Sequence, residues 1–309
     1  MNQAKDVPCQ LGWIGTGRMG LAMADRLLSA GRVFRVWNRT ASKALPLAEK
    51  GATVAQDLFE LGSCDIVFMI VASHHEVDAV LFGERGLLSG KNKPRIIVDC
   101  TSIGSEESAF IREKLFELGI SFIAAPVSGN AKVIHAGKLS IVASGPEDAF
   151  KEVEPYLYVI GRSVSYVGTG DLARIAKICH NVMLGVITQN LSEILVLAEK
   201  SGLKRHDFLN FLNSSVMGSL FTRYKSPALT NLDFEVTFTP QLMLKDLDLG
   251  LSAARALGVP MPTTSVTRDQ VQSLIGHGYG DDFSQLLLLE AAAAGLLLRS
   301  EETDVDDGL

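Results

Sequence analysis

The stretch Leu11-Gly12-Trp13-Ile14-Gly15-Thr16-Gly17-Arg18-Met19-Gly20 decides the fold of this chain. It joins an apolar, strand-like run to a helical run at residues 21–28 through the pattern G-x-G-x-x-G. In this setting the first glycine permits a tight turn, the second lets the backbone approach a pyrophosphate, and the third lets helix and strand pack closely. The N-terminus of the helix supplies N–H groups for the phosphates. The stretch therefore predicts a dinucleotide-binding unit in preference to a simple glycine-rich turn.

Short apolar runs alternate with helical segments over the first half of the chain. Several runs are continuously apolar, as expected of parallel strands that are covered on both faces. The runs are Gln10–Gly15, Val33–Trp37, Asp65–Ala72, Arg95–Asp99, Ile120–Ala124, Leu139–Ser144 and Ser163–Val167. This alternation predicts an α/β fold in which residues 1–168 form a Rossmann doubly wound sheet that binds the nucleotide.

The pattern then changes, and residues 169–309 are predicted to form an all-α domain. Apolar side chains recur at steps of three and four over residues 172–198, and the pattern stops at Ser201-Gly202. So long an apolar helix has to be covered nearly all round, by later helices, by a second subunit or by both. We expect it to link the two domains. Further helical patterns run over residues 242–257 and 282–298.

Composition excludes several classes of protein. The 309 residues carry a formal net charge of −6, whereas nucleic-acid-binding proteins normally show a basic excess or stripe. The N-terminal segment has no signal-peptide apolar core, and the apolar stretch 286–298 is too short for a bilayer and contains Glu290. We therefore expect a soluble, cytoplasmic protein with neither nucleic-acid nor membrane partners. The acidic tail 301–309 is expected to be frayed.

The cysteines and histidines do not predict a metal site. Cys9, Cys64, Cys100 and Cys179 lie far apart, and three of them have apolar neighbours. They are typical of reduced core thiols rather than of disulfides or metal ligands. His74-His75 have no third ligand at a sensible spacing and are expected in a polar loop near the cofactor.

The end of the second predicted strand indicates which dinucleotide binds. An NAD enzyme usually carries an acidic residue here, about 20 positions after the glycines, which bonds to the ribose 2′-hydroxyl. This strand instead ends in Asn38-Arg39-Thr40, without a carboxylate. Arg39 can bind a 2′-phosphate and stack on adenine, while Asn38 and Thr40 can add hydrogen bonds. We favour NADP(H), with NAD(H) still possible; the alternative is an Asn-capped loop with a solvated arginine.

Loops at the ends of other predicted strands should border the nicotinamide, because ligands bind beyond the carboxyl ends of such strands. These loops begin at Val71-Ala72, at Asp99-Cys100-Thr101-Ser102 and at Ala125-Pro126-Val127-Ser128-Gly129-Asn130. Ser128 and the N–H groups that follow it make a small donor-rich pocket, which suits a carboxylate. Taken alone, Ser128-Gly129-Asn130 is more simply a turn.

Lys177 and Asn181 lie four residues apart in Ala176-Lys177-Ile178-Cys179-His180-Asn181-Val182-Met183-Leu184, inside the predicted long helix. One helical turn brings both to the same face, with His180 beside them. A lysine among apolar residues is costly unless it is paired or used, and burial can lower the pKa of its ammonium toward neutrality. Together with the dinucleotide fingerprint, Lys177 indicates hydride transfer with a lysine acid/base. His180 either assists the proton transfer or is a structural histidine.

The chain resembles the β-hydroxyacid dehydrogenases, the family of 3-hydroxyisobutyrate dehydrogenase, tartronate semialdehyde reductase and glyoxylate/succinic semialdehyde reductase. The resemblance covers nearly the whole chain in order and rests on four motifs at family-like spacing. The motifs are Gly12-Trp13-Ile14-Gly15-Thr16-Gly17-Arg18-Met19-Gly20, Ala125-Pro126-Val127-Ser128-Gly129 with Gly137-Lys138-Leu139, Lys177-Ile178-Cys179-His180-Asn181, and Leu244-Lys245-Asp246-Leu247.

The resemblance implies roles for residues at the reacting end. Lys177 would be the general acid/base, giving a proton to a carbonyl oxygen in reduction and taking the hydroxyl proton in oxidation. Asn181 would orient the substrate, and Ser128, Gly129 and Asn130 would hold its carboxylate. The implied partner is therefore a small carboxylate-bearing molecule.

Other implied roles concern the cofactor and the assembly. Ser102 would lie by the nicotinamide ribose, while Lys245 on the cofactor and Asp246 on the substrate would close the site from the helical domain. The long helix would pack in a dimer, so we expect a homodimer or a homotetramer.

The chain also departs from the family pattern, which leaves the particular substrate undefined. Asp171-Leu172-Ala173 replace a glycine-rich G-x-G before the lysine, and His180 replaces the first of two asparagines. Asn130 and Val133 stand where glycines are usual. By the resemblance, these changes line the substrate pocket.

Three alternative functions agree less well with the sequence. Imine reduction on a related scaffold is disfavoured by Lys177, because protonating a carbonyl suits a lysine. A non-catalytic cofactor-binding module would be expected to lack the lysine and to add a recognition domain. A sugar-phosphate dehydrogenase would need an arginine cluster beside Ser128. Arg223 either binds a substrate acid group or forms a surface ion pair, and Lys245-Asp246-Leu247-Asp248, taken alone, is typical of a solvated helix face.

Overall fold

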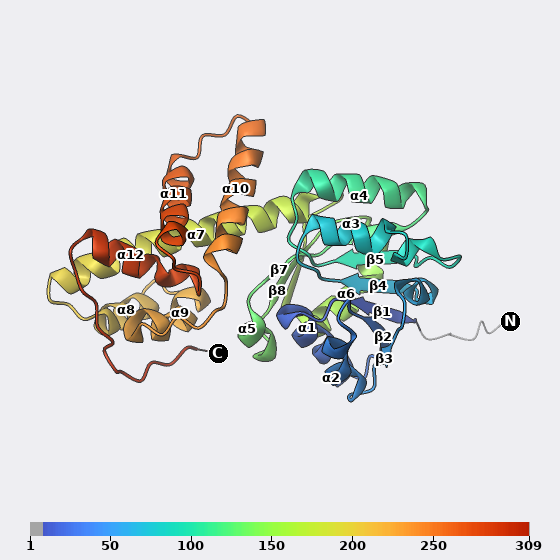
Figure 1. Ribbon diagram of the computed structural model, residues 1–309, viewed down its shortest axis with the longest axis horizontal. Coiled ribbons are helices and arrows are strands. Elements are labelled where there is room, and N and C mark those ends of the chain that lie inside the picture. Colours follow the sequence, from blue (N-terminus) through green and yellow to red (C-terminus); the bar gives the residue numbers. More distant parts are fainter. Residues whose placement is uncertain (1–8, 309) are drawn as a thin grey trace. The chain divides into compact units, whose positions relative to one another are not determined.

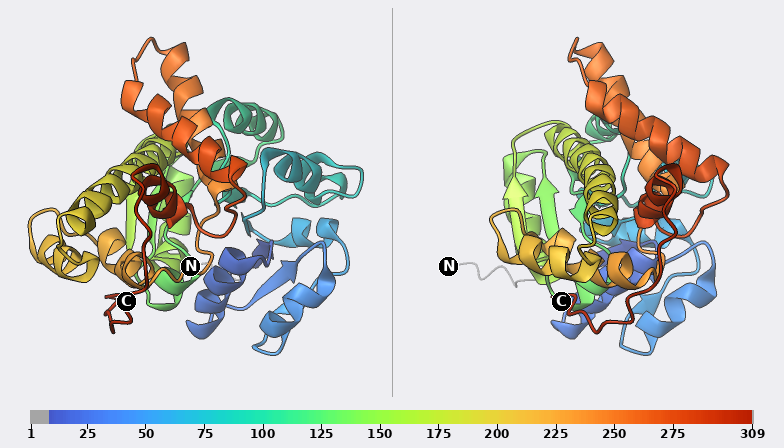
Figure 2. Two further views of the ribbon diagram at one scale, coloured as in Figure 1. Left: turned by 60° about the vertical axis from the view of Figure 1, so that its left-hand side comes forward. Right: turned by 90° about the vertical axis from the view of Figure 1, so that its left-hand side faces the viewer.

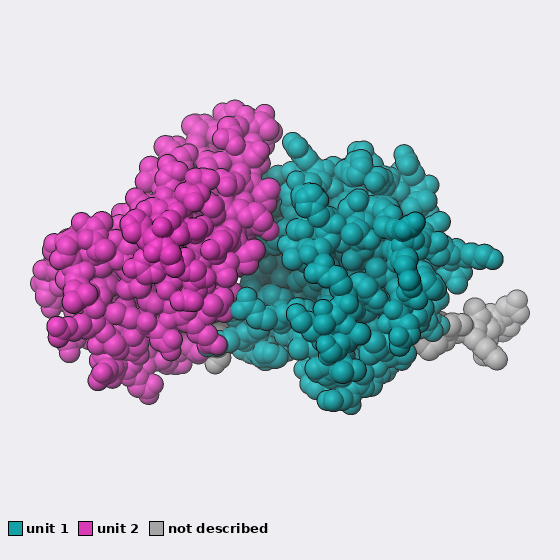
Figure 3. Space-filling model, in the orientation of Figure 1, with its two compact units in different colours: residues 1–177 teal, residues 178–309 magenta. Residues whose placement is uncertain are grey.

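The computed structural model describes residues 9–308 and divides into two compact units, residues 1–177 and residues 178–309 (Figure 3). Of the described residues, those in strands all belong to unit 1, whereas those of unit 2 form helices joined by loops. The division falls inside one helix, α7 (Leu172–Lys200). The boundary predicted between residues 168 and 169 lies just ahead of the start of this helix.

Unit 1 is built on a six-stranded parallel sheet with the order β3-β2-β1-β4-β5-β6 (Figure 1). The strands are β1 (Leu11–Ile14), β2 (Phe34–Trp37), β3 (Thr53–Val54), β4 (Ile66–Met69), β5 (Ile96–Asp99) and β6 (Ser121–Ala124). β1, β4 and β5 are buried along their whole length, which explains their continuously apolar sequences. The chain leaves β1 toward β2 on one side and returns to β4 on the other, so the topological switch point lies between β1 and β4.

Helices cover both faces of this sheet, as a doubly wound fold requires. One apolar cluster includes side chains from α1 (Arg18–Ser29), α2 (Leu45–Ala48), α5 (Ala131–His135) and α6 (Glu147–Ile160). The cluster on the other face includes side chains from α3 (His74–Phe82) and α4 (Ser105–Glu117). Short 3-10 helices connect these elements at η1 (Ala41–Ala44), η2 (Leu58–Ser63) and η3 (Leu87–Ser89). The predicted Rossmann architecture is confirmed.

The last two predicted runs do not extend the large sheet. They form a second sheet of β7 (Val127–Ser128), β8 (Ser140–Ala143) and β9 (Ser163–Tyr166), in which β7 is antiparallel to β8. A single antiparallel bridge between Ala124 and Ser144 connects the two sheets. β3 and β7 were missed in the sequence because a run of two residues shows no alternation.

Unit 2 continues from α7 through five further helices. These are α8 (Arg205–Ser214), α9 (Leu220–Asn231), α10 (Pro240–Ala256), α11 (Pro262–Gly276) and α12 (Leu286–Ala293), the last preceded by the 3-10 turn η4 (Phe283–Gln285). α10 and α11 run side by side as a helical hairpin (Figure 2). The prediction that α7 ends at Ser201-Gly202 is confirmed, with Gly202 at a φ of +86° that favours glycine.

By length and composition alone, α7 could also cross a membrane. A core helix of a soluble protein passes the same test, and 56% of the most apolar part of α7 is buried. Two of its buried polar side chains are bonded within the helix itself, since Thr188 donates to the carbonyl oxygen of Leu184 and Ser192 to that of Thr188.

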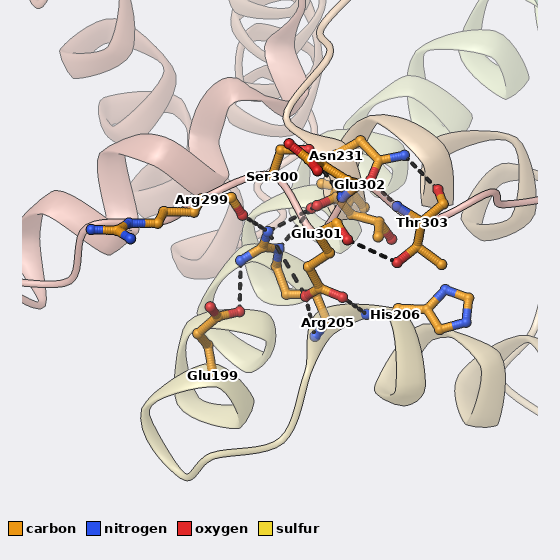
Figure 4. Close-up of polar contacts among 11 residues, drawn as sticks. Glu199, Arg205, His206, Asn231, Arg299, Ser300, Glu301, Glu302 and Thr303 are labelled. Carbon is orange, nitrogen blue, oxygen red and sulfur yellow. Dashed lines mark hydrogen bonds and ion pairs between the residues drawn. The ribbon is translucent and has the colours of Figure 1, made fainter.

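The expected fraying of the acidic tail is wrong for its first residues (Figure 4). Glu301 accepts hydrogen bonds from the backbone N–H groups of Arg205 and His206 at 2.8 and 3.1 Å. The guanidinium of Arg205, which is fully buried, also donates to Glu199 and to the carbonyl oxygen of Arg299. The tail is held because it satisfies a buried charge, a long-range contact that composition does not indicate. Leu309 lies outside the described residues.

The four cysteines are free thiols, but only two of them are core residues. Cys64 and Cys100 are buried, whereas Cys9 and Cys179 are exposed. Burial raises the pKa of Cys64 to about 11, which keeps this thiol protonated and unreactive. The exposure of Cys179 corrects the expectation of a core thiol, because the apolar neighbours of Cys179 in sequence lie on other faces of α7.

Candidate active site

The glycine-rich loop between β1 and α1 has the geometry that its sequence predicts. Gly15 has a φ of +96°, and a Cβ there would lie 2.0 Å from the carbonyl oxygen of Ile70. A Cβ on Gly20 would lie 2.3 Å from the carbonyl oxygen of Gly15, so this glycine lets α1 approach the loop. Around Gly17, by contrast, a Cβ would meet no described protein atom within 4 Å. The loop therefore leaves open space at the N-terminus of α1.

Trp13 of β1 holds this loop by a side-chain hydrogen bond. Its indole N–H donates to the carbonyl oxygen of Gly15 at 2.8 Å, and its ring stacks on Phe68 of β4 with centroids 5.9 Å apart. The side chain is buried. A large aromatic residue in β1 thus gives the turn a rigid support, which a glycine-rich loop would not have by itself.

The residues of this loop fit a dinucleotide. The first turn of α1 carries no acidic residue, so its positive helix end is available to a phosphate. The Thr16 hydroxyl is buried and has no hydrogen-bond partner among the described residues. A buried hydroxyl without a partner is uncommon unless a ligand or water completes it. Arg18 and Met19 follow Gly17 at the start of α1, where Arg18 is exposed and Met19 is half-buried.

Asn38-Arg39-Thr40 follow β2 directly, as predicted. The Asn38 side chain accepts a hydrogen bond from the backbone N–H of Thr16 at 2.9 Å and donates to the carbonyl oxygen of Thr40. Asn38 therefore ties the end of β2 to the glycine-rich loop. The Arg39 side chain is 81% exposed, and its guanidinium lies 3.7 Å from the carboxylate of Glu76.

Glu76 was missed in the sequence. It lies in the first turn of α3, where Ser73 donates a hydrogen bond to its carboxylate at 2.9 Å. His74-His75, expected in a loop, instead begin this helix, with their rings 3.8 Å apart. The polar character of the pair hid the helix start, and Ser73 before them was the available signal.

The loops after β4 and β5 are joined to each other. The backbone N–H of Val71 donates to the Thr101 hydroxyl at 3.1 Å, and the backbone N–H of Thr101 donates to Asp99 at 2.9 Å. Ala72 is exposed and Ser102 is half-buried beside these groups in sequence. Hydrogen bonds thus connect the two loops at the carboxyl ends of β4 and β5, where these candidate residues lie.

The Ser128-Gly129-Asn130 segment leads from β7 into α5. Gly129 has a φ of +139°, and a Cβ there would lie 2.8 Å from Val133, so only glycine fits. Asn130 caps α5 by accepting a hydrogen bond from the backbone N–H of Val133 at 3.0 Å. Its amide nitrogen has no hydrogen-bond partner among the described residues. Val133, which replaces a usual glycine of the family, is buried and supports this turn.

Lys177 lies on the second turn of α7 and is half-buried. It is the last residue of unit 1, the unit that also contains the glycine-rich loop and the Ser128 segment. The predicted helical spacing of Lys177 and Asn181 is confirmed, because both lie on α7.

Asn181 belongs to unit 2, where both ends of its amide are held. Its nitrogen donates to the carboxylate of Asp246 on α10 at 2.5 Å, and its oxygen lies 2.9 Å from Nδ1 of His180. Asp246 is 4% exposed, so the interpretation of Lys245–Asp248 as a solvated face is wrong at Asp246. Lys245, which is partly exposed, lies 3.7 Å from the Asp246 carboxylate.

Arg223 lies on the exposed side of α9 and donates to the carbonyl oxygen of Asn213 at 3.1 Å. It is a surface residue in contact with the end of α8. Among residues 9–308, no three His, Cys, Asp or Glu side chains come together in a group that could hold a metal ion.

The chain matches two family models in succession. The model described as the NAD binding domain of 6-phosphogluconate dehydrogenase matches residues 10–168. The model described as NAD-binding of NADP-dependent 3-hydroxyisobutyrate dehydrogenase matches residues 170–289. Both matches fall on elements described above.

Similar proteins match this chain over about nine tenths of its length. A probable 3-hydroxyisobutyrate dehydrogenase-like 1, mitochondrial, of Arabidopsis thaliana is 33% identical over 282 residues, which cover 91% of this chain and 84% of that protein. Glyoxylate/succinic semialdehyde reductase 1 of the same plant is 30% identical over 280 residues, 90% of this chain and 97% of that protein. A crystal structure of 3-hydroxyisobutyrate dehydrogenase from Salmonella typhimurium has a TM-score of 0.81 at 25% identity, and covers 91% of this chain and 100% of its own.

Fold, glycine-rich loop and matches together define a class, the nicotinamide-dependent oxidoreductases with a Rossmann domain and a helical second domain. Within this class the chain belongs to the β-hydroxyacid dehydrogenase family, the family of 3-hydroxyisobutyrate dehydrogenase. The resemblance inferred from the four motifs is confirmed.

Proposed function

We propose that this protein is an NADP(H)-preferring oxidoreductase that interconverts a small β-hydroxy acid and its semialdehyde, with Lys177 as general acid/base. The observation that carries the proposal is the position of Lys177. It stands on the second turn of α7 within the same compact unit as a glycine-rich loop that fits a dinucleotide.

The proposed substrate class follows from the relatives. Their names give 3-hydroxyisobutyrate, glyoxylate and succinic semialdehyde as substrates. Each of these molecules combines a carboxylate with a hydroxyl or carbonyl carbon that can exchange a hydride. A small acid of this kind is therefore the substrate class we propose for this chain.

The preference for NADP(H) is supported by the end of β2. No carboxylate follows the strand, and the exposed Arg39 guanidinium can form two parallel hydrogen bonds to a 2′-phosphate. Asn38 holds this segment against the glycine-rich loop. NAD(H) lacks the 2′-phosphate, so it would gain only the stacking of Arg39 on adenine.

The chemistry that we assign to the chain is proton transfer. NADP(H), when bound, supplies or accepts the hydride. In reduction Lys177 donates a proton from Nζ to the carbonyl oxygen, and in oxidation it accepts the proton of the hydroxyl. A general acid and base of this kind typically contributes about 10²- to 10⁴-fold in rate.

The carboxylate of the substrate is assigned to Ser128, Gly129 and Asn130. This segment offers a hydroxyl and successive backbone N–H groups, and the Asn130 amide nitrogen is a donor without a partner among the described residues. The positive φ of Gly129 makes the segment turn at this residue. These features support an anion-binding role.

Asn181 is proposed to orient the substrate. An amide that is fixed at both ends keeps one direction, and Asp246 and His180 hold Asn181 in this way. The nitrogen of Asn181 has a second N–H besides the one given to Asp246. In this proposal Asp246 acts through Asn181, while Lys245 remains a predicted cofactor contact.

We also propose a homodimer or homotetramer. On helix α7, Leu172 is 50% exposed, and Met183 and Leu197 are each 63% exposed. Exposed apolar side chains on this helix support the expectation that another subunit covers part of it.

The proposed function is tested by steady-state turnover with glyoxylate, succinic semialdehyde, methylmalonate semialdehyde and tartronate semialdehyde, each with NADPH and with NADH. Butanal is the matched control for succinic semialdehyde, because it has the same chain without the carboxylate. We expect turnover with at least one acid aldehyde, a higher kcat/KM with NADPH, and little activity on butanal. Ser128→Ala should raise KM for the acid aldehyde without changing the KM for NADPH.

Cofactor binding without turnover of any acid aldehyde would contradict the proposed function. Equal activity on butanal and succinic semialdehyde would contradict carboxylate recognition alone, and equal kcat/KM with both cofactors would contradict the preference for NADP(H).

A further inference from the structure

A buried ion pair lies one helical turn ahead of Lys177. The guanidinium of Arg174 on α7 lies 2.6 Å from the carboxylate of Asp99, at the carboxyl end of β5, and the two side chains are 1% and 0% exposed. The same guanidinium donates to the Ser108 hydroxyl of α4 at 3.2 Å and to the carbonyl oxygen of Thr101. Every nitrogen of the guanidinium therefore has an acceptor.

The pair connects α7 to the loops that border the proposed cofactor site. Asp99 also accepts a hydrogen bond from the backbone N–H of Thr101, whose hydroxyl accepts one from the backbone N–H of Val71. The first turn of α7 is further held through Ala173, whose N–H donates to the Ser144 hydroxyl at 3.0 Å. The start of α7 and the loops after β4 and β5 thus form one hydrogen-bonded network inside unit 1.

Burying an ion pair to hold a helix in place costs free energy. The desolvation of both charges offsets much of their attraction, so apolar side chains of similar volume would often stabilise a fold as well. The pair does fix a geometry, because a planar guanidinium can donate to its three acceptors in only one orientation. Residues three apart on a helix are neighbours, so this arrangement also sets the position of Lys177.

We propose that Arg174, through Asp99, is a positioning residue that fixes Lys177 relative to the loops at the carboxyl ends of β4 and β5. The inference rests on the proposed function, in which Lys177 transfers a proton. A displacement of about 1 Å in a reacting group can cost about 100-fold in rate, so a firm anchor one turn away has a direct catalytic consequence.

Arg174→Gln separates this role from cofactor binding. The substitution cuts the tie to α7 but leaves the bonds among Asp99, Thr101 and Val71 in place. We expect kcat, normalised to the number of NADPH-binding sites found by fluorescence titration, to fall about 10- to 100-fold. The Kd for NADPH and the KM for the acid aldehyde should change by less than threefold.

Arg174→Lys is the second variant, because it keeps the positive charge beside Asp99 but cannot form the fork of three contacts. It should fold where Arg174→Gln does not, and its kcat should lie between those of the wild type and Arg174→Gln. Asp282→Asn is the control for general destabilisation, since Asp282 forms an ion pair of the same length and burial with Lys225 in unit 2. Its kcat per binding site should remain within twofold of the wild type.

A measurement that does not depend on turnover is amide hydrogen exchange over residues 172–181. At residues 172–177, which belong to unit 1, Arg174→Gln should exchange faster than both the wild type and Asp282→Asn. Unchanged exchange in Arg174→Gln, or an unchanged kcat with an active wild type, would overturn the role of Arg174 and leave the proposed function intact. Absence of turnover in the wild type would instead overturn the proposed function, and the role of Lys177 with it.

Discussion

Two side chains with opposite charges, Arg39 and Glu76, set the chemistry of the proposed 2′-phosphate site. The carboxylate of Glu76 lies 3.7 Å from the guanidinium and would compete with a phosphate for it. Because the pair is largely exposed, its own energy is small, at most about 1 kcal/mol. The arginine is therefore held in place but remains available to a ligand.

Arg39→Ala should weaken NADPH selectively. The loss of charge-assisted hydrogen bonds worth about 1.5–3 kcal/mol corresponds to about a tenfold to hundredfold rise in the KM for NADPH. The KM for NADH should rise much less, since NADH has no 2′-phosphate and would lose only the stacking of Arg39 on adenine. Glu76→Gln, the matched variant, should lower the KM for NADPH up to about fivefold by removing the competing charge. Equal effects of Arg39→Ala on both cofactors would show that Arg39 does not read the 2′-phosphate.

Gly15 and Gly17 give a second test at this scale, because one glycine serves the fold and the other serves the ligand. Gly15→Ala should lower the free energy of unfolding by about 1–3 kcal/mol, since φ is +96° and the Cβ meets a backbone oxygen. Gly17→Ala should change stability by less than about 0.5 kcal/mol, yet weaken NADPH at least about tenfold by occupying the open space. Urea unfolding and fluorescence titration measure the two effects. The account of the loop fails if Gly17→Ala binds NADPH as the wild type does.

At the scale of elements, a buried ion pair in unit 2 links α9 to the segment that precedes η4. Asp282, just before η4, accepts hydrogen bonds from Lys225 of α9 at 2.6 Å and from the hydroxyls of Ser284 and Thr237. Burial alone would raise the pKa of Asp282, but the lysine charge and these donors outweigh it and hold the pKa below its ordinary value. The Asp282 carboxylate is therefore ionised in the folded protein at neutral pH.

Asp282→Asn should destabilise the protein by about 3–5 kcal/mol at pH 7, because it leaves the Lys225 ammonium buried without a counter-charge. The folded pKa is the lower one, so the contribution of Asp282 is complete above the unfolded pKa of about 3.9 and is lost as pH falls through the folded value. The difference in unfolding free energy between wild type and variant should be constant from pH 5 to 8 and shrink below about pH 4. A difference that persists undiminished at low pH would contradict this assignment.

The strands and helices differed in how well the sequence predicted them. Continuous apolar runs gave β1, β4 and β5, since strands covered on both faces leave no polar position. α8, α9 and α11 were missed because each buries few apolar residues among many polar ones. Their starts were marked only by local signals, such as the capping box of Ser219 and Thr222 before α9.

At the scale of the whole molecule, the candidate site could be predicted where it depends on strand ends. The glycine-rich loop, Asn38-Arg39-Thr40 and the loops after β4 and β5 follow from the rule that ligands bind beyond the carboxyl ends of parallel strands. The partners of these residues could not be predicted. Arg174 and Asp99 are 75 positions apart, and Arg205 and Glu301 are 96 apart, so only the folded chain brings them together.

The boundary between the two units lies between Lys177 and Asn181 on α7. Lys177 belongs to the unit that carries the glycine-rich loop, and Asn181 belongs to the helical unit, where Asp246 holds it. Their spacing on one helix was visible in the sequence, but their separate anchors were not. The group that we propose to transfer the proton thus belongs to the Rossmann unit, and the amide that we propose to orient the substrate belongs to the helical unit.

The most direct test of the central claim is kcat for Lys177→Ala with the best acid aldehyde at saturating NADPH. If Lys177 donates the proton, kcat should fall about 10²- to 10⁴-fold while the Kd for NADPH stays within twofold of the wild type. A Lys177→Ala enzyme that keeps its kcat would show that another group protonates the carbonyl, and would contradict the account of this active site.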